Sequence, residues 1–428
     1  MKWFAALLIL ASSVAPALAE TEEAPIKPGE LLTIERAVTV ALKMNPAIRS
    51  AQGGVAAGEA RKGLAASGYY PHIDASAGYT RIQPGGVQTG SGTSHSFEQY
   101  STGVTARQTI FDFGKTGTQV EIQKRTIEAS RADLGGTEDQ IILNVKQAYY
   151  ELLRAKRNLV VALDTVRQFQ QHLEQAKAFY EVGTRPKFDV TKAEVDLSSA
   201  KLGQINAENA VRLAVASLNN AMGVPDAPEY AVEDNLQFQK YTIGFDDAMR
   251  KAYENKPELK AIAARKAAAA LSIALAKKDY YPVFTGSASW QWSGERFAIG
   301  DSWSAGVGMS FPIFSGFQTR YQVDEARANY NILSSNELSL KNSVRLEVQQ
   351  AYLNMIEAED RIGVAELSVR QAIENHEIAS GRYAAGVGNP IEVTDAEIAL
   401  ATAKLVHIRA MVDYKIAVAS LEKAMGSR

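Results

Sequence analysis

The sequence predicts a mainly α-helical protein in which long coiled-coil helices flank two membrane β-hairpins. Three observations support this fold class. Apolar residues follow a heptad pattern in two long segments, apolar and small polar residues alternate between the helical segments, and one helix–hairpin–helix unit occurs twice. The composition agrees, because only 13 prolines in 428 residues is typical of a largely helical chain.

Two stretches of the chain align with each other in the same order. Residues 32–70 align with 243–281 without a gap, and further matches follow at a second constant offset. The matched motifs are Tyr69-Tyr70-Pro71 with Tyr280-Tyr281-Pro282, Gln147-Ala148-Tyr149 with Gln350-Ala351-Tyr352, and Ala221-Met222-Gly223 with Ala424-Met425-Gly426. Such a collinear set indicates an internal repeat. The expected parts are an N-terminal arm (20–31), repeat 1 (32–223), a connector (224–242) and repeat 2 (243–426).

Each repeat contains one long segment with a heptad register. In the first repeat, spacings of four and three alternate through Ile141, Val145, Ala148, Leu152, Ala155, Leu159, Ala162, Val166, Phe169, Leu173, Ala176 and Tyr180. The second repeat keeps this register from Val344 to Tyr383, and His376 is its one polar member. An unbroken seam of this kind is the signature of a coiled-coil helix.

The long helix of the first repeat is expected to begin near Gly117 and to end near Val182. At ~1.5 Å per residue it would be roughly 100 Å long. The segments 34–68 and 188–221 are each about half as long. Stacked end to end, these two segments would match the long helix in length. Each repeat would therefore supply two full-length helical columns, or staves, to a closed ring of helices.

The hairpin of the second repeat is expected at about 283–314. Small polar residues alternate with Phe284, Gly286, Ala288, Trp290 and Trp292, and again with Trp303, Ala305, Val307, Met309, Phe311 and Ile313. This alternation suits membrane strands that have one face toward lipid and one toward water. Trp290, Trp292 and Trp303 lie near the loop 293–301, where a membrane aromatic girdle would form.

The hairpin of the first repeat is expected at about 72–113. Its first strand alternates well from Ile73 to Tyr79, whereas Gln108 interrupts either face of the returning strand near 101–113. The loop between the strands, 83–100, is rich in Gly, Ser and Thr. An ordinary half-buried antiparallel sheet is the alternative interpretation of each hairpin.

Four strands cannot close a barrel around a pore, because small barrels already need about eight strands. An export duct built from this chain must therefore be an oligomer. Three copies would give twelve strands, although the sequence itself does not specify three.

The first 19 residues have the three parts of a secretory signal. Lys2 supplies the positive end, Phe4 to Ala11 form an apolar run, and Ala17-Leu18-Ala19 supply small residues for cleavage, so we expect the mature chain to begin at Glu20. No later stretch approaches the length of a transmembrane helix.

The composition excludes several classes of site. Without cysteine the chain has no disulfides, thiolate metal sites or thiol nucleophiles. The formal charge of −2 gives no sign of nucleic-acid binding. The five histidines show no metal-ligand spacing, and no set of residues forms a catalytic constellation. We therefore expect neither enzymatic activity nor a metal or cofactor site.

The ordered set of motifs resembles the TolC family of outer-membrane efflux and secretion ducts over essentially the whole mature chain. It comprises the paired repeats, the Tyr-Tyr-Pro entries into the strands, the Ala-Met-Gly ends, and the helical-hairpin turns Tyr180-Glu-Val-Gly-Thr and Tyr383-Ala-Ala-Gly-Val. The resemblance implies a passive homotrimeric duct with a twelve-stranded β-barrel in outer-membrane lipid and an α-barrel across the periplasm. It also implies two partners for efflux or type I secretion, a periplasmic adaptor (membrane fusion) protein and an inner-membrane pump of RND or ABC type.

The family closes its periplasmic end with helical tips that carry acidic residues. The matching positions are Glu392 and Asp395 after the second turn, and Asp189 takes the place of Glu392 in the first repeat. Tyr383 matches a tip tyrosine that takes part in closing hydrogen bonds. Gly388 stands where some members carry a basic residue that ties the tips together, and Arg185 in the first turn is the candidate substitute.

Each of these interpretations has an alternative. The three acids also suit the first turn of a helix, where the macrodipole stabilises negative charge. The function that competes with a duct is that of a periplasmic coiled-coil adaptor or scaffold, although an adaptor usually has one helical hairpin rather than two.

The chain ends two residues after Gly426, so we expect the girdle around the helices to come mainly from 224–242 and the N-terminal arm.

Overall fold

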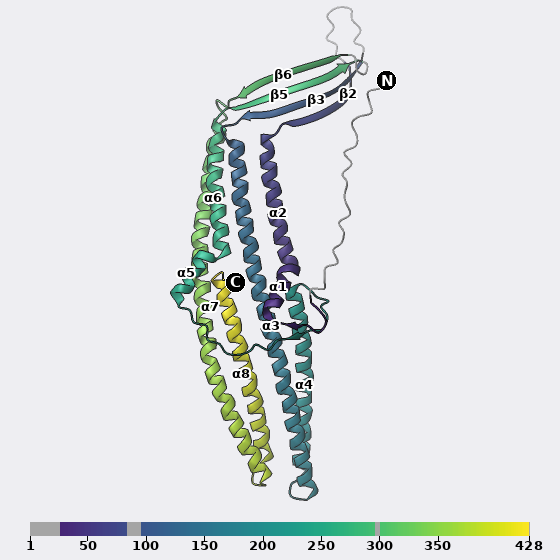
Figure 1. Cartoon of the computed structure of the whole chain (residues 1–428), viewed down its shortest axis with the longest axis vertical. Coiled ribbons are helices and arrows are strands. Elements are labelled where there is room, and N and C mark those ends of the chain that lie inside the picture. The colour runs from purple at the N-terminus through teal and green to yellow at the C-terminus, as the bar shows by residue number, and fades with distance from the viewer. Residues whose placement is uncertain (1–25, 84–95, 296–299, 428) are drawn as a thin grey trace, which may run out of the picture.

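The computed structural model describes residues 26–83, 96–295 and 300–427, and shows an elongated bundle of helices with a β-sheet across one end (Figure 1). The first half of the chain forms α1 (Ile34–Met44), α2 (Pro46–Ala66), β2 (His72–Ile82), β3 (Phe97–Phe111), α3 (Lys115–Glu181) and α4 (Lys187–Met222). The second half forms α5 (Phe245–Asn255), α6 (Pro257–Lys277), β5 (Val283–Gly294), β6 (Asp301–Ser310), α7 (Gln318–Ala384) and α8 (Pro390–Ala424). The expected signal peptide at 1–19 and much of both strand loops lie outside the described residues.

Helices α3 and α7 each run for 67 residues, and α3 begins and ends within two residues of the expected Gly117 and Val182. A turn at Asp112 starts α3, because its carboxylate accepts hydrogen bonds from the backbone N–H groups of Lys115 (3.0 Å) and Thr116 (2.7 Å). Gly183, with a φ of 75°, follows the end of α3. Most of the heptad seam is buried or half-buried between these bounds, with Val145 and Leu152 fully covered.

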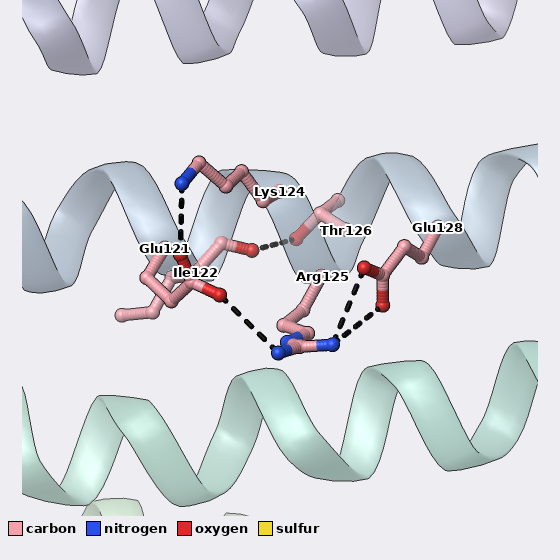
Figure 2. Close-up of polar contacts among 6 residues, drawn as sticks. All are labelled: Glu121, Ile122, Lys124, Arg125, Thr126 and Glu128. Carbon is pink, nitrogen blue, oxygen red and sulfur yellow. Dashed lines mark hydrogen bonds and ion pairs between the residues drawn. The ribbon is translucent and has the colours of Figure 1, made fainter.

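Charged residues outside the seam are paired along the helix itself. In Figure 2, Arg125 of α3 reaches Glu121 at 3.3 Å and Glu128 at 3.0 Å, while Lys124 reaches Glu121 at 3.1 Å. All of these side chains are at least one-third exposed, so each pair contributes about a few tenths of a kcal/mol at most to the stability of the helix. This part of α3 is therefore a charged surface that is exposed to solvent in the single chain.

The segment 34–68, treated above as one helix, is divided into α1 and α2 at Asn45. The Asn45 side chain accepts from the backbone N–H of Ala47 at 2.9 Å, and Pro46 cannot continue the preceding helix. The matching break between α5 and α6 lies at Lys256, before Pro257. Both breaks occur at the mid-height of the bundle (Figure 1).

The shorter helices stack end to end at these breaks, as their lengths suggested. The Asn45 side-chain amide donates to the Ala221 carbonyl at 2.9 Å. Gly223, with a φ of 76°, lies so close that a Cβ there would stand 2.7 Å from the Cα of Asn45. Gly426 is held in the same way against Lys256, at 2.9 Å. The Ala-Met-Gly motifs therefore mark the joints where α4 meets α2 and α8 meets α6.

The four long strands form one antiparallel sheet in the order β2-β3-β5-β6. Their register brings the alternating apolar residues of all four strands to a single face. Members of this face are Ile73, Ala75, Ala77, Tyr79, Val104, Ala106, Phe284, Ala288, Trp290, Trp292, Trp303, Ala305, Val307 and Met309. Ser, Thr and Gly dominate the opposite face.

Two strand bounds differ from the expectation. Strand β6 ends at Ser310, so Phe311 and Ile313 lie beyond it. Strand β3 begins at Phe97 rather than near Ser101, and a bulge between Thr109 and Phe111 shifts its register. Gln108 lies on the apolar face and interrupts it, and the bulge then returns Phe111 to the same face. For this reason the sequence of the strand showed no continuous apolar alternation on either face.

A belt crosses the middle of the bundle where the N-terminal arm meets the connector. Strand β1 (Leu31–Leu32) pairs in parallel with β4 (Ala231–Val232). The buried Tyr149 hydroxyl donates toward the carbonyl oxygens of Leu32 (3.1 Å) and Glu233 (2.8 Å). Tyr414 holds the other end of the connector, since its hydroxyl accepts from the Tyr241 backbone N–H at 2.8 Å. The belt therefore comes from the two segments expected to form it.

Candidate functional site

Two helical turns lie at the end of the bundle opposite the sheet (Figure 1). Helices α3 and α4 are joined through Gly183, and α7 and α8 through Gly386, which has a φ of 79°. Asn389 caps α8 by accepting from the Ile391 backbone N–H at 3.0 Å, and Pro390 occupies its first turn. We call the ends of these two helical hairpins the α3–α4 tip and the α7–α8 tip.

Tyr383 of the α7–α8 tip is inserted against the α3–α4 tip. Its side chain is fully buried, and its ring centroid lies 5.0 Å from that of His172 and 5.6 Å from that of Phe179. Its homologue in the first repeat, Tyr180, is 46% exposed. The duplicated tyrosines therefore differ, because only Tyr383 faces another hairpin within this chain.

Arg185 ties the two tips together. Its guanidinium donates to the carbonyl oxygens of Gly386 (3.2 Å) and Gly388 (2.8 Å), and lies 5.6 Å from the centroid of the Tyr383 ring. A Cβ at Gly388 would stand 2.7 Å from the backbone nitrogen of Tyr383. The turn therefore has no room for a basic side chain at Gly388, whereas Arg185 reaches its carbonyl from the other hairpin.

Asp189 lies beside this contact and is only 5% exposed. Burial and the nearby Asp189 carboxylate raise the pKa of Tyr383, while the Arg185 cation lowers it. The Asp189 Oδ2 and Tyr383 hydroxyl atoms have no hydrogen-bond partner within the described part of the chain. Asp189 was expected to take the same place as Glu392, but it is buried between the tips, because the α7–α8 tip covers it.

Glu392 and Asp395 lie on the exposed surface of α8. Glu392 is 49% exposed, and its carboxylate is 3.7 Å from Arg382. A spacing of three residues places both acids on one side of the helix. The structure therefore separates the five expected tip residues into a buried contact (Arg185, Asp189 and Tyr383) and an exposed acidic pair.

A second polar cluster just above the tips was not expected. The Thr394 hydroxyl donates to Asp196 at 3.1 Å, and Asp196 is also paired with Lys192. Glu397 is 3% exposed, with its Oε1 atom 3.7 Å from Nε2 of His376. The sequence did contain a signal, because Glu397 occupies an apolar-stripe position of α8 between Val393 and Leu400.

The three expected girdle tryptophans lie together on the apolar face of the sheet. Trp290 is opposite Trp303, and the Trp290 and Trp292 rings are stacked with centroids 5.6 Å apart. Trp303 is 74% exposed, and Val307 on the same strand 72%. The sheet thus presents a large uncovered apolar face, which marks an interaction surface.

Among the described helices, none is long and apolar enough to cross a membrane. Within the described ranges, no group of His, Asp and Glu side chains is arranged to hold a metal ion.

The sequence matches the family model described as Outer membrane efflux protein over residues 37–224 and 248–427. These ranges cover most of the chain. The chain belongs to the outer membrane efflux protein family. The match includes both sets of helices and strands, and the competing interpretation as an adaptor or scaffold does not account for it.

Several relatives share the sequence along most of their length. The chain is 25% identical to the protein CyaE of Bordetella pertussis over 388 residues, which cover 88% of this chain and 80% of CyaE. It is 25% identical to the outer membrane protein TolC of Vibrio cholerae over 382 residues, covering 84% and 83%. It is 22% identical to the toluene efflux pump outer membrane protein TtgF of Pseudomonas putida over 399 residues, covering 91% and 82%.

Solved structures share the fold. The CusC channel superposes with a TM-score of 0.80 at 18% identity, covering 95% of this chain and 97% of CusC. The outer membrane protein VceC of Vibrio cholerae superposes with a TM-score of 0.76 at 18% identity, covering 92% and 96%.

This member of the outer membrane efflux protein family is thus an outer-membrane channel that extends into the periplasm, with the TolC-like combination of long helices and four antiparallel strands. The family is not enzymatic, and its members are outer membrane efflux proteins.

Proposed function

We propose that three copies of this chain form a passive duct for a tripartite efflux pump or a type I secretion system. A periplasmic adaptor and an inner-membrane pump of RND or ABC type would complete the assembly and supply the energy. The efflux pump named in the description of TtgF supports this kind of partner. The two repeats, 32–223 and 243–426, would each contribute two staves of the helical wall, with the connector 224–242 between them.

The sheet is the part that we place in the outer membrane. Strands β2 and β6 are its two edges, and each leaves a row of backbone groups unpaired within the described sheet. Joining the edges of three copies would close a twelve-stranded barrel. The apolar face would then meet lipid, with Trp290, Trp292 and Trp303 as its aromatic girdle near the loop ends.

The tips are the part that we propose as the gate. Closing the duct requires the α7–α8 tip to stay against the α3–α4 tip, and Arg185 supplies two hydrogen bonds for this purpose. Separating the tips would also expose the buried Tyr383 and Asp189. The Arg185 contact with the carbonyl oxygens of Gly386 and Gly388 is the single observation that carries the gate proposal.

The exposed pair, Glu392 and Asp395, would line the aperture. Three-fold symmetry would bring three copies of each carboxylate together at the narrow end of the duct. A ring of carboxylates favours cations over anions.

The gate is tested by replacing Arg185 with alanine and recording single channels in planar bilayers. Loss of two charge-assisted hydrogen bonds, each worth about 1.5–3 kcal/mol, should shift the tips toward the open state by at least tenfold. We therefore expect larger or more frequent open-level currents for Arg185→Ala than for the wild type. Arg167→Ala is the matched control, because Arg167 is 68% exposed and, among the described residues, its ion pair is with Asp164 on its own helix. Equal currents from all three proteins would contradict the proposed gate.

A further inference from the structure

A pocket lies where the sheet meets the helices, between the end of α6 and the start of α7. It has a volume of about 500 Å³. Side chains that line it include Lys277, Tyr280 and Tyr281 from the first segment and Arg320, Asp324 and Arg327 from the second. This basic and aromatic composition sets the pocket apart from the acidic surface of the α7–α8 tip at the other end of the bundle.

The pocket carries an excess of positive charge. Arg327 is 3.3 Å from Asp324, an exposed pair on one helix that is worth little. Within the described ranges, Lys277 and Arg320 have no acidic partner within 4.0 Å. A concave site with two uncompensated cations attracts an anion.

Neighbouring lysines at the same junction serve the fold instead. Lys278 donates to the Gly114 carbonyl oxygen at 2.8 Å and to the Thr118 hydroxyl at 2.7 Å. Lys115 is paired with Asp279. These two lysines are therefore engaged in contacts that join the sheet to the helices, and they differ in this from Lys277 and Arg320 of the pocket.

A row of aromatic rings connects the pocket to the apolar face of the sheet. Phe284 on that face has its ring centroid 6.5 Å from Phe111, which lies 4.7 Å from Phe113. Phe113 in turn stacks on Tyr281 at 5.1 Å, and Tyr281 lines the pocket. The pocket thus lies at the edge of the surface that we place against lipid, where aromatic rings are favoured.

The backbone at Phe113 is unusual in a way that fits this row. Phe113 has a φ of 55°, a left-handed conformation that a bulky residue seldom adopts. Such a conformation is strained and persists only where the surroundings hold it. Here it sets the ring of Phe113 between those of Phe111 and Tyr281.

We propose that this pocket binds the phosphodiester of a phospholipid headgroup from the periplasmic leaflet of the outer membrane. Lys277 and Arg320 would hold the phosphate, since guanidinium groups form charge-assisted hydrogen bonds with phosphate oxygens. The acyl chains would lie along the aromatic row toward the apolar face. This continuity favours a lipid over a free phosphate ion. The inference rests on the proposed placement of the sheet in the membrane.

The test is native mass spectrometry of the detergent-purified full-length channel with three probes, namely dioleoyl phosphatidylglycerol, dioleoylglycerol and inorganic phosphate. We expect the wild type to retain phosphatidylglycerol but not dioleoylglycerol. The double variant Lys277→Gln/Arg320→Gln should retain it about thirtyfold more weakly, because two basic side chains near the headgroup, at about 1 kcal/mol each, contribute about 2 kcal/mol together. The control Lys201→Gln/Arg212→Gln removes the same charges from the exposed surface of α4 and should match the wild type.

Several results would overturn the proposal. Equal retention of phosphatidylglycerol by the pocket variant and the wild type is one, and equal retention of dioleoylglycerol by the wild type is another. Displacement of the lipid by inorganic phosphate would identify a free anion as the ligand. Planar-bilayer currents from the same preparations report separately on the membrane placement, so a channel that conducts but does not retain phosphatidylglycerol would refute the lipid site alone.

Discussion

The contact between the two tips depends on both the guanidinium of Arg185 and the absence of a side chain at Gly388. A side chain at Gly388 would collide with Tyr383, while the exposed carbonyl oxygen of Gly388 accepts a hydrogen bond from Arg185. The first turn therefore carries the cation of this contact, and the second turn carries the carbonyl oxygen that accepts from it.

The exposed acids at the tip make a prediction about selectivity. Replacing Glu392 and Asp395 by alanine should reduce the cation preference of the channel, because the proposed carboxylate ring is then removed. The reversal potential under a salt gradient in planar bilayers measures this preference. Glu366→Ala/Glu374→Ala is the control, since it removes two exposed acids of α7 away from the tip turn. Unchanged selectivity in the tip variant would show that these acids do not line the constriction.

Glu397 makes a prediction about pH. Burial, followed by the neighbouring Asp196 charge, raises the pKa of Glu397 to about 7. His376, 3.7 Å away, offers no lasting countercharge, because burial lowers its pKa. The folded chain keeps a proton that the unfolded chain releases above about pH 4.5, so this residue lowers stability as the pH rises from about 4.5 to about 7.

The variant Glu397→Gln should relieve this loss. Its apparent Tm should exceed that of the wild type by a few degrees at pH 8 and approach it at pH 4.5, as measured by thermal unfolding in detergent. Glu366→Gln, at an exposed position, should follow the wild type at both pH values. A difference that is the same at both pH values would show that the glutamate proton is not the cause.

The sequence predicted the identity of the tip residues but not their surroundings. Tyr383 and Asp189 stand at positions that the aligned turns share with Tyr180 and Glu392. Arg185 aligns with Gly388 and was chosen only as the candidate substitute for a basic residue there. The alignment made Asp189 and Glu392 equivalent, yet one is buried and the other exposed. The difference arises because Asp189 lies in the contact between the two tips of the chain, whereas Glu392 lies outside it. An alignment of the repeats gives equivalent positions but does not show which of them is buried in that contact.

The joints between stacked helices make a prediction at the level of elements. Gly183 and Gly223 both have a φ near 75°, but a Cβ would meet nothing within 4 Å at Gly183 and the Asn45 backbone at Gly223. Gly183→Ala should therefore cost about 1 kcal/mol from backbone strain alone. Gly223→Ala adds a collision at the joint, so its apparent Tm should fall further. Equal Tm values for the two variants would contradict the close contact between α4 and α2.

The strands and helices could be predicted to different extents. Period-two alternation located both hairpins, whereas the bulge near Ile110 could not be read from the sequence, because Gln108 interrupts either face. The heptad seam located α3 and α7 closely, since an uninterrupted register leaves few choices. The break at Asn45-Pro46 was missed although an asparagine cap before a proline is a recognised start signal for a helix.

The whole molecule combines these elements into a stave that is incomplete by itself. The sheet has two open edges and an uncovered apolar face, and the helices expose apolar residues such as Leu353 (54%) and Val364 (72%) beyond their buried seams. Edges and apolar surfaces of this size are protected in stable proteins by closure or association. The open edges and apolar surfaces therefore favour association, as the proposed trimer requires.

The number of copies in the detergent-extracted protein tests the duct most directly. Four strands cannot enclose a pore, so every other part of the account depends on association. Native mass spectrometry of the protein extracted from membranes should show three copies of the mature chain, stable until strong heating. A soluble monomer, or a complex of two copies, would contradict the twelve-stranded barrel and the gate built upon it.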